Sequence, residues 1–386
     1  MSRSVSALEQ RCRVDVDLGA IAHNVRVLQE RAVPAALCAV VKGDGYGHGA
    51  VEVARSAVAA GASWLGVACA AEAVPLRRAG LDVPVLVLAE PPPADYEAVL
   101  EHGLRAVVYT AEGIDGLAAH ARRRGARVTV HLKVDTGMHR AGCEGAAAPD
   151  LAIRLARDPA FELEGLMTHL ATSDEPSRPD ASVQLERFRR LLGRLRSAGW
   201  RPAIVHAANS SGLLAHPDSH FDLVRAGIAL YGLGPFTDQP WSEALRPALS
   251  LHARVSRVGP VRAGEGVSYG LRWRAPRDSV LATLSIGYGD GVRRALGAAG
   301  APVLLGGRRC PMVGVVTMDQ LVVDCGPGAT VRVGDTATLI GRQGREVVGA
   351  GLWAELLDTI DYEVVTGIGP RVARRYLPGV RGNRLN

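Results

Sequence analysis

The sequence predicts an α/β protein in which a (β/α)8 barrel of the TIM type is followed by a mostly antiparallel β domain. Short apolar runs alternate with Ala-rich amphipathic segments as far as Tyr231, which is typical of strand-helix units around a parallel sheet. A proline-containing connection at 235–248 then leads into Val, Thr and Leu runs broken by Gly, Pro and Asp. We therefore expect a barrel domain at 13–240 and a β domain at 241–386.

Eight apolar runs have the length and spacing of barrel strands. They are 37–42, 64–68, 84–89, 104–109, 127–134, 163–169, 203–207 and 221–225. Helical patterns fit between them, including 49–60, 70–80 and 181–198, and one late helix is expected at 351–358. A strand at 13–17 and a helix with an apolar face precede the first barrel strand. Eight strands suffice to close a barrel, although a doubly wound open sheet is the alternative.

The composition and charge argue against several function classes. The formal net charge is +6, but the arginines are scattered and form no nucleic-acid-binding arm. The 6 cysteines have no CxxC or metal-type spacing, which indicates reduced thiols. His216 and His220 are four apart, yet Pro217 between them favours a turn over a metal site. Without a secretory leader or an apolar run of membrane-spanning length, we expect a cytoplasmic protein with no membrane partner.

Polar side chains follow five of the eight expected strands. Barrel enzymes carry their catalytic groups at the carboxyl ends of their strands, so these positions predict one shared active site. Any one of these residues alone has a structural explanation, as a core histidine, an ion pair or a helix cap. In strand order the residues are Lys42, then Lys133 and Arg140, then His169, then His206, Asn209 and Ser210, and finally Arg225.

The same strand ends indicate a cofactor. A lysine at the mouth of a barrel, such as Lys42, can lose its proton when it is desolvated, and the neutral amine forms Schiff bases. The last two strands lead into Ser210 and Gly227, whose surroundings supply backbone amides of the kind that bind phosphate in barrels. A Schiff-base lysine facing a phosphate site points to pyridoxal phosphate. Nucleotide-binding glycine motifs are absent from the sequence.

These residues and their neighbours resemble the pyridoxal-phosphate-dependent alanine racemases over essentially the whole chain. The resemblance extends through both expected domains, and its segments together are far more specific than any one short motif. The matching segments are 40–42, 46–49, 133–138 with Arg140 and Gly142, 168–169, 206–210, 224–228, 231–232, 267–270, 286–291, 318–319 and 362–364.

The resemblance implies an isomerase that interconverts L-alanine and D-alanine and supplies D-alanine for peptidoglycan. It also implies a head-to-tail homodimer with shared active sites, in which the first strand, at about 12–17, joins the second domain. Lys42 would carry the cofactor and act as one base, and Tyr269 of the partner subunit would be the other. The remaining implied residues are Tyr46, His169, Asn209, Ser210, Arg225, Gly227, Ile228 and Tyr362 for the cofactor, Arg140 and Met318 for the substrate, and, as supports, His206, Tyr288, Asp319 and Lys133, which can be carbamylated in this family.

Arg225 is implied to face the pyridine nitrogen, and its chemistry separates the alternatives. An arginine stays protonated and donates to that nitrogen, so the ring withdraws electrons less strongly than it would beside a carboxylate. This favours racemisation over a decarboxylase of related architecture, which would typically also bring a reactive cysteine from its β domain. A non-catalytic cofactor-handling barrel is the third reading, but it would leave the second domain and Tyr269 unexplained.

Overall fold

The computed structural model describes residues 11–234 and 244–378, and these form two compact units. The barrel unit contains Leu18–Gly45 and Gly49–Pro247, and the β unit contains the chain up to Asp17, the short segment Tyr46–His48 and the chain from Ala248 onwards. The expected domain boundary between residues 240 and 241 lies outside the described residues. In the described part of the chain, every helix is too short or too polar to cross a bilayer.

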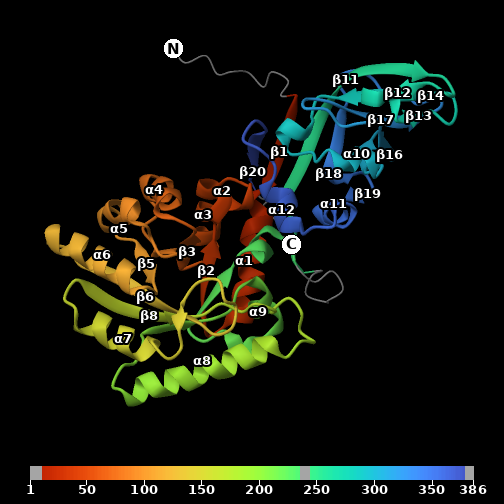
Figure 1. The fold of residues 1–386 in the computed structure, drawn as a ribbon. Helices are drawn as coiled ribbons and strands as arrows, with labels where there is room; N and C mark the ends of the chain where they lie inside the picture. The colour runs from red at the N-terminus through yellow and green to blue at the C-terminus, as the bar shows by residue number, and fades with distance from the viewer. Residues whose placement is uncertain (1–10, 235–243, 379–386) are drawn as a thin grey trace, which may run out of the picture. The chain divides into compact units, whose positions relative to one another are not determined.

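The barrel unit is built on a parallel sheet of eight strands, which confirms the predicted fold class (Figure 1). The strands are hydrogen-bonded in the order β10-β2-β3-β4-β5-β6-β8-β9. Their bounds are β2 Ala36–Val40, β3 Trp64–Val67, β4 Val85–Val87, β5 Arg105–Val108, β6 Val128–Asp135, β8 Phe161–Met167, β9 Ile204–His206 and β10 Leu223–Ala226, and the two-residue β7 Cys143–Glu144 pairs with β6.

Backbone hydrogen bonds beside β9 and β10 bring the two ends of the sheet together. The amide of Asp222 donates to the carbonyl of Val205 at 2.9 Å, and that of Arg225 donates to the carbonyl of Ala208 at 3.0 Å. Most residues of these strands are buried, as expected for a parallel sheet covered by helices. The carboxyl ends of all eight strands consequently meet at one face of the barrel.

Helices between the strands cover the outside of the barrel (Figure 1). In α1 the buried residues include Ile21, Val25 and Leu28, which form the apolar face that the sequence predicted. The helices are α1 Leu18–Ala32, α2 Lys42–Tyr46, α3 Ala50–Ala59, α4 Ala70–Arg78, α5 Tyr96–Glu101, α6 Ala111–Arg123, α7 Ala148–Arg157, α8 Asp180–Ser197 and α9 Ser210–Ala215, with short 3-10 turns η1 Pro93–Asp95, η2 Pro217–Ser219 and η3 Ile228–Tyr231.

The β unit contains a nine-stranded sheet in the order β19-β18-β15-β16-β17-β14-β11-β1-β20. Its pairs are antiparallel except for β1 with β20, and β1 (Cys12–Asp17) also pairs with β11 (Figure 1). The other strands are β11 Leu249–Val261, β14 Ser279–Leu284, β15 Pro302–Leu305, β16 Arg308–Val313, β17 Leu321–Gly326, β18 Thr336–Gln343, β19 Glu346–Val348 and β20 Ala373–Leu377, and β12 Gly266–Val267 pairs with β13 Trp273–Arg274 as a separate hairpin.

Two local expectations are corrected. The first barrel strand was expected to run to Lys42, but β2 ends at Val40 and Lys42 begins the turn-like α2. One late helix was expected, whereas the structure has both α11 (Ala350–Leu357) and α12 (Asp361–Thr366). A helix of 6 residues is too short to show a helical period in the sequence. The β unit also contains the short helix α10 (Ala295–Ala298) and the 3-10 turns η4 (Tyr269–Leu271) and η5 (Tyr288–Asp290).

Candidate active site

Lys42 is held at the carboxyl end of β2 by a left-handed turn. Gly43, Asp44 and Gly45 have φ angles of 61°, 50° and 62°, a conformation that glycine adopts without strain. The amide of Gly43 donates to Glu72 Oε1 at 2.7 Å, and the Asp44 carboxylate accepts from the amide of Ala50 at 2.9 Å. The turn therefore fixes the backbone immediately after the lysine and leaves Lys42 partly exposed to solvent at the barrel mouth.

Several cationic groups act on one another beside Lys42. Partial burial at the barrel mouth, followed by the charge of Arg140, lowers the pKa of the Lys42 amine, and Glu72 opposes this shift. Lys133 is buried on β6, and burial together with the charges of Arg225 and Arg140 lowers its pKa to about 8. Such a positive cluster favours neutral amines and attracts anions such as phosphate and carboxylate.

Arg225 lies buried on β10 and donates to two histidines. Its NH1 donates to His206 Nδ1 at 2.9 Å, and its NH2 donates to His169 Nδ1 at 3.2 Å and to the carbonyl of Ala207 at 2.9 Å. A guanidinium has no acceptor, so both Nδ1 atoms accept and the ring proton of each neutral histidine is on Nε2. Burial, and then the charge of Arg225, lowers the pKa of both histidines well below the usual range, so both rings are neutral.

Ser210 and Asn209 organise the backbone between β9 and β10. Ser210 Oγ accepts from the amides of Gly227 at 2.8 Å and Ala229 at 3.3 Å, which leaves its own hydroxyl proton to be donated. Asn209 caps α9 by accepting from the amide of Gly212 at 2.8 Å. Ile228 begins η3, so these predicted residues lie together in the barrel unit.

Arg140 lies on the exposed loop that follows β6. Asp135 Oδ1 accepts from the amides of Gly137 at 2.7 Å and Met138 at 2.9 Å. Burial acts against the charged carboxylate, but the amides of this loop hold the pKa of Asp135 below its usual range. The loop that presents Arg140 is therefore anchored by an ionised carboxylate at its base.

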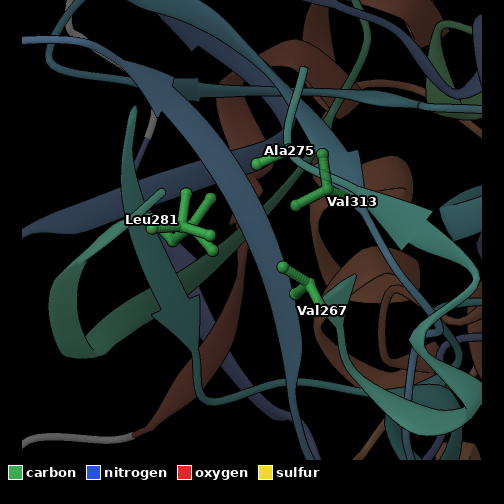
Figure 2. Close-up of a cluster of buried hydrophobic side chains, with 5 residues drawn as sticks. Val267, Ala275, Leu281 and Val313 are labelled. Carbon is green, nitrogen blue, oxygen red and sulfur yellow. The ribbon is translucent and has the colours of Figure 1, made fainter. Parts of the chain in front are cut away.

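Tyr269 lies in the β unit at the tip of the β12-β13 hairpin. Ser268 has a φ of 62° and its Oγ donates to the carbonyl of Val315 at 2.7 Å, which turns the chain outwards and leaves Tyr269 73% exposed. A cluster of buried apolar side chains anchors the hairpin (Figure 2). Val267, two residues before Tyr269, belongs to this cluster. The members of the cluster are Val261, Val267, Ala275, Leu281 and Val313.

The other predicted residues of the β unit are placed separately. Met318 and Tyr288 are 51% and 44% exposed, and Asp319 accepts from Arg371 at 2.6 Å. The rings of Tyr46 and Tyr362 are 6.1 Å apart between centroids and tilted by 57°. The structure therefore groups the predicted residues of the barrel unit at one site. Tyr269 and the residues named in this paragraph belong to the β unit.

Comparison with known proteins identifies the family. Residues 16–235 match the N-terminal domain of alanine racemase, and residues 248–376 match its C-terminal domain. The chain is 49% identical to an alanine racemase of Symbiobacterium thermophilum over 94% of this chain and 96% of the relative, and 47% identical to that of Mycobacterium tuberculosis over 94% of each. The chain belongs to the alanine racemase family. The crystal structure of alanine racemase from D-cycloserine-producing Streptomyces lavendulae is similar, with a TM-score of 0.91 and 38% identity over 96% of this chain and 98% of that one.

This alanine racemase, an isomerase, also contains site residues that the sequence reasoning missed. Glu72 accepts from the amide after Lys42, but an acid in the first turn of a helix is ordinary and gave no signal. Gln184 donates to the carbonyl of His169 at 3.1 Å and accepts from the amide of Ala171 at 2.8 Å. Its position on the buried apolar face of α8 is a signal that could have identified it.

His131 is a further residue that the sequence reasoning missed. It is buried on β6 and its Nδ1 lies 2.8 Å from His206 Nε2. Its position two residues before Lys133 on the same face of the strand could have identified it. His220, by contrast, bonds to the carbonyl of Leu213 at 2.9 Å next to η2, the turn that begins at Pro217.

Proposed function

We propose that this alanine racemase works with pyridoxal phosphate and two bases, and that it supplies D-alanine for peptidoglycan. The observation that carries the proposal is the grouping of Lys42, Lys133 and Arg225 at the carboxyl ends of the barrel strands. A neutral amine beside permanent cations is the environment that Schiff-base chemistry with an anionic cofactor needs.

The residues present in the barrel unit fit this cofactor. Lys42 would hold it covalently, because its lowered pKa increases the neutral, nucleophilic fraction of the amine. Ser210, Asn209, Gly227 and Ile228 would hold the phosphate, since the Ser210 hydroxyl can donate outward while its oxygen accepts from the amide of Gly227. In the β unit we assign Tyr46 and Tyr362 to the same phosphate.

When bound, pyridoxal phosphate withdraws electrons from the α-carbon of an amino acid and makes its α-proton acidic. Arg225 would donate to the ring nitrogen and keep it unprotonated, because a guanidinium cannot accept a proton. His206 holds Arg225 in this orientation through the bond at 2.9 Å. Arg225 thus moderates the activation of the α-carbon, which favours return of the proton over side reactions.

Two bases on opposite faces of the α-carbon would move the proton. We assign Lys42 to the face from which it removes the proton of D-alanine, and Tyr269 of a second copy to the opposite face. Arg140 would orient the substrate carboxylate, with Met318 beside it. The Nε2 proton of His169 is available to orient the phenolic oxygen of Tyr269, because Arg225 already occupies its Nδ1.

The exposed side chains of the β unit support a head-to-tail homodimer. Four large side chains of this unit are between 44% and 73% exposed, namely Tyr269, Leu271, Met318 and Tyr288. They add a large exposed apolar surface to one unit. We assign these side chains to the surface that a second copy covers, with Tyr288 and Asp319 supporting Tyr269 there. The six free thiols fit a reducing compartment, and we place the enzyme in the cytoplasm.

The test is proton NMR of L-alanine in D2O with the purified protein and added pyridoxal phosphate, followed by chiral analysis of the product. We expect the α-proton signal to disappear while D-alanine forms. Exchange without inversion would refute the second base, and the absence of exchange would refute the reaction. L-Serine and L-lysine, tested in parallel, would define the substrate range, and release of carbon dioxide from lysine would favour the decarboxylase alternative.

A further inference from the structure

A line of hydrogen bonds crosses the barrel interior from Arg225 to a carboxylate on β8. Arg225 NH1 donates to His206 Nδ1 at 2.9 Å, the facing nitrogens of His206 and His131 are 2.8 Å apart, and His131 Nε2 lies 2.9 Å from Glu164 Oε2. Both histidines are fully buried, whereas the Glu164 side chain is 19% exposed. The line therefore joins the proposed cofactor site to the edge of the barrel.

The chemistry at the two ends allows only one direction of donation. Arg225 cannot accept, so His206 Nδ1 accepts and its Nε2 proton is donated to His131 Nδ1. His131 must then carry its own proton on Nε2 and donate it to Glu164. An ionised carboxylate cannot donate, so Glu164 ends the line as its acceptor.

The charge states of the members agree with this direction. Burial lowers the pKa of His131, although Glu164 opposes this shift, so both rings are neutral. Burial acts against the charge of Glu164, but the bond from His131 and the nearby guanidinium of Arg105, 3.6 Å away, lower the pKa of the carboxyl. A neutral pair of rings thus separates a buried cation from an anion.

The packing around His131 leaves room for one ring position. Gly165 pairs with His131 across β8 and β6, and a Cβ at Gly165 would lie only 2.4 Å from His131 Nδ1. The ring centroids of Trp64 and His131 are 5.7 Å apart, with an interplanar angle of 68°. Arg105 Cζ lies over the Trp64 ring, 5.8 Å from its centroid. The absence of a side chain at Gly165 therefore leaves the space that the His131 ring occupies.

We propose that Glu164 is a positioning residue for the racemase reaction, which acts through His131 and His206 to fix the orientation of the Arg225 guanidinium toward the cofactor ring. This rests on the proposed function, in which Arg225 faces that ring. Glu164 supplies the ionised acceptor in which the line ends, and its bond to His131 Nε2 holds that ring in the tautomer that Arg225 imposes through His206. A glutamine in its place could still accept from His131 Nε2 but carries no charge, so the hydrogen bond that holds the His131 ring would be weaker.

The first measurement needs no substitution in the enzyme under test. In holoenzyme labelled with 15N-histidine, the nitrogen shifts of His131 and His206 should report neutral rings protonated on Nε2, with the signals assigned by their loss in single His131 and His206 variants. The same pattern should hold without added cofactor. A proton on Nδ1 of either ring in the holoenzyme would overturn the proposal.

The second measurement compares Glu164→Gln with Glu162→Gln, a matched control two residues earlier on the same side of β8, where Glu162 accepts only at the surface from Thr129 at 3.2 Å. Glu164→Gln should change the His131 nitrogen shifts and lower kcat by about ten- to hundredfold with a smaller change in KM, as removal of a carboxylate behind a functional histidine commonly does. Glu164→Asp should recover part of this loss, and Glu162→Gln should match the unmodified enzyme in both readouts.

Unchanged histidine shifts in Glu164→Gln, or an equal effect of Glu162→Gln, would refute the positioning role. Turnover by the unmodified enzyme reports separately on the proposed function. If that enzyme racemises alanine while the histidine tautomers differ from those expected, only the inference about Glu164 fails. If the tautomers are as expected but the unmodified enzyme shows no α-proton exchange, the proposed function fails instead.

Discussion

Lys42 and Lys133 differ in reactivity because their amines have different surroundings. Lys42 is partly exposed to solvent, whereas Lys133 is buried on β6 among the charges of Arg225 and Arg140, and the pKa of Lys133 falls to about 8. An amine with that pKa is about one-tenth neutral at pH 7, compared with well under one-thousandth for an ordinary lysine. Lys133 is therefore primed to react with an electrophile, and a carbamate there would place a negative charge beside Arg140.

We predict that Lys133 takes up carbon dioxide in a pH-dependent way. Only the neutral amine reacts, so carbamate formation should rise as the pH rises toward about 8 and the amine loses its proton. With 13C-bicarbonate, a carbamate resonance should be stronger at about pH 8 than at about pH 6.5, and absent in Lys133→Ala. A resonance that persists in Lys133→Ala would assign the modification to another amine.

We predict that Tyr269→Phe uncouples proton exchange on the two faces of alanine. The two enantiomers are equally stable, so net conversion must fall equally in both directions, and turnover alone cannot identify the face. Exchange of the α-proton in D2O can: it should fall by about 10²- to 10⁴-fold for L-alanine, the range for losing a general base, and by much less for D-alanine. Tyr96→Phe, on helix α5, should leave both exchange rates unchanged, whereas an equal small loss for both enantiomers in Tyr269→Phe would contradict its role as a base.

At the scale of elements, glycines decide how closely two segments of the β unit approach one another. In the β unit, Gly47 has a φ of 78° and a Cβ there would lie 2.4 Å from the carbonyl oxygen of Val365 on α12. Gly264 in the same unit has a φ of 85° but no atom within 4 Å of such a Cβ. The two positions share the left-handed conformation and differ in the space available.

We predict that Gly47→Ala lowers the free energy of unfolding by about 2–4 kcal/mol, because left-handed strain is combined with a clash against backbone that cannot rotate away. Gly264→Ala should cost only the strain, about 1–2 kcal/mol. Urea denaturation followed by circular dichroism measures both values. Equal losses would show that the clash at Gly47 is relieved by movement of α12.

The sequence was informative where a single element carries the signal. Buried parallel strands read as short apolar runs, so all eight barrel strands could be counted, and Lys42 was found because it follows such a run. The role of His131 was missed because it depends on the pairing of His131 with Gly165 across two strands, and that register is not a local property. The sequence interpretation likewise extended the first barrel strand to Lys42, where the left-handed turn already begins. Glycine permits several backbone conformations and does not specify one, so the start of the turn could not be predicted.

At the scale of the whole molecule, the proposed site needs residues from two copies of the chain. Lys42 lies in the barrel unit and Tyr269 lies in the β unit, at the tip of a hairpin anchored by its own apolar cluster. A base on an exposed hairpin contributes to catalysis only when another surface closes over it, because general base catalysis requires hydrogen-bonding distance to the proton. The proposed homodimer would supply that surface in a symmetric way, so each interface would build two sites.

We predict that inactive Lys42→Ala and Tyr269→Phe variants restore activity when they are combined in one dimer. In a shared-site dimer, one of the two sites would contain both substitutions and the other would contain neither. Random mixing of equal amounts makes about half of the dimers mixed, and in these purified mixed dimers about half of the sites should be intact. Co-expression with two different tags, purification of the doubly tagged species and an alanine racemisation assay measure this directly. Two differently tagged Lys42→Ala chains provide the control, which should remain inactive, and failure of the mixed dimer to exceed that control would mean that each site is built from a single chain.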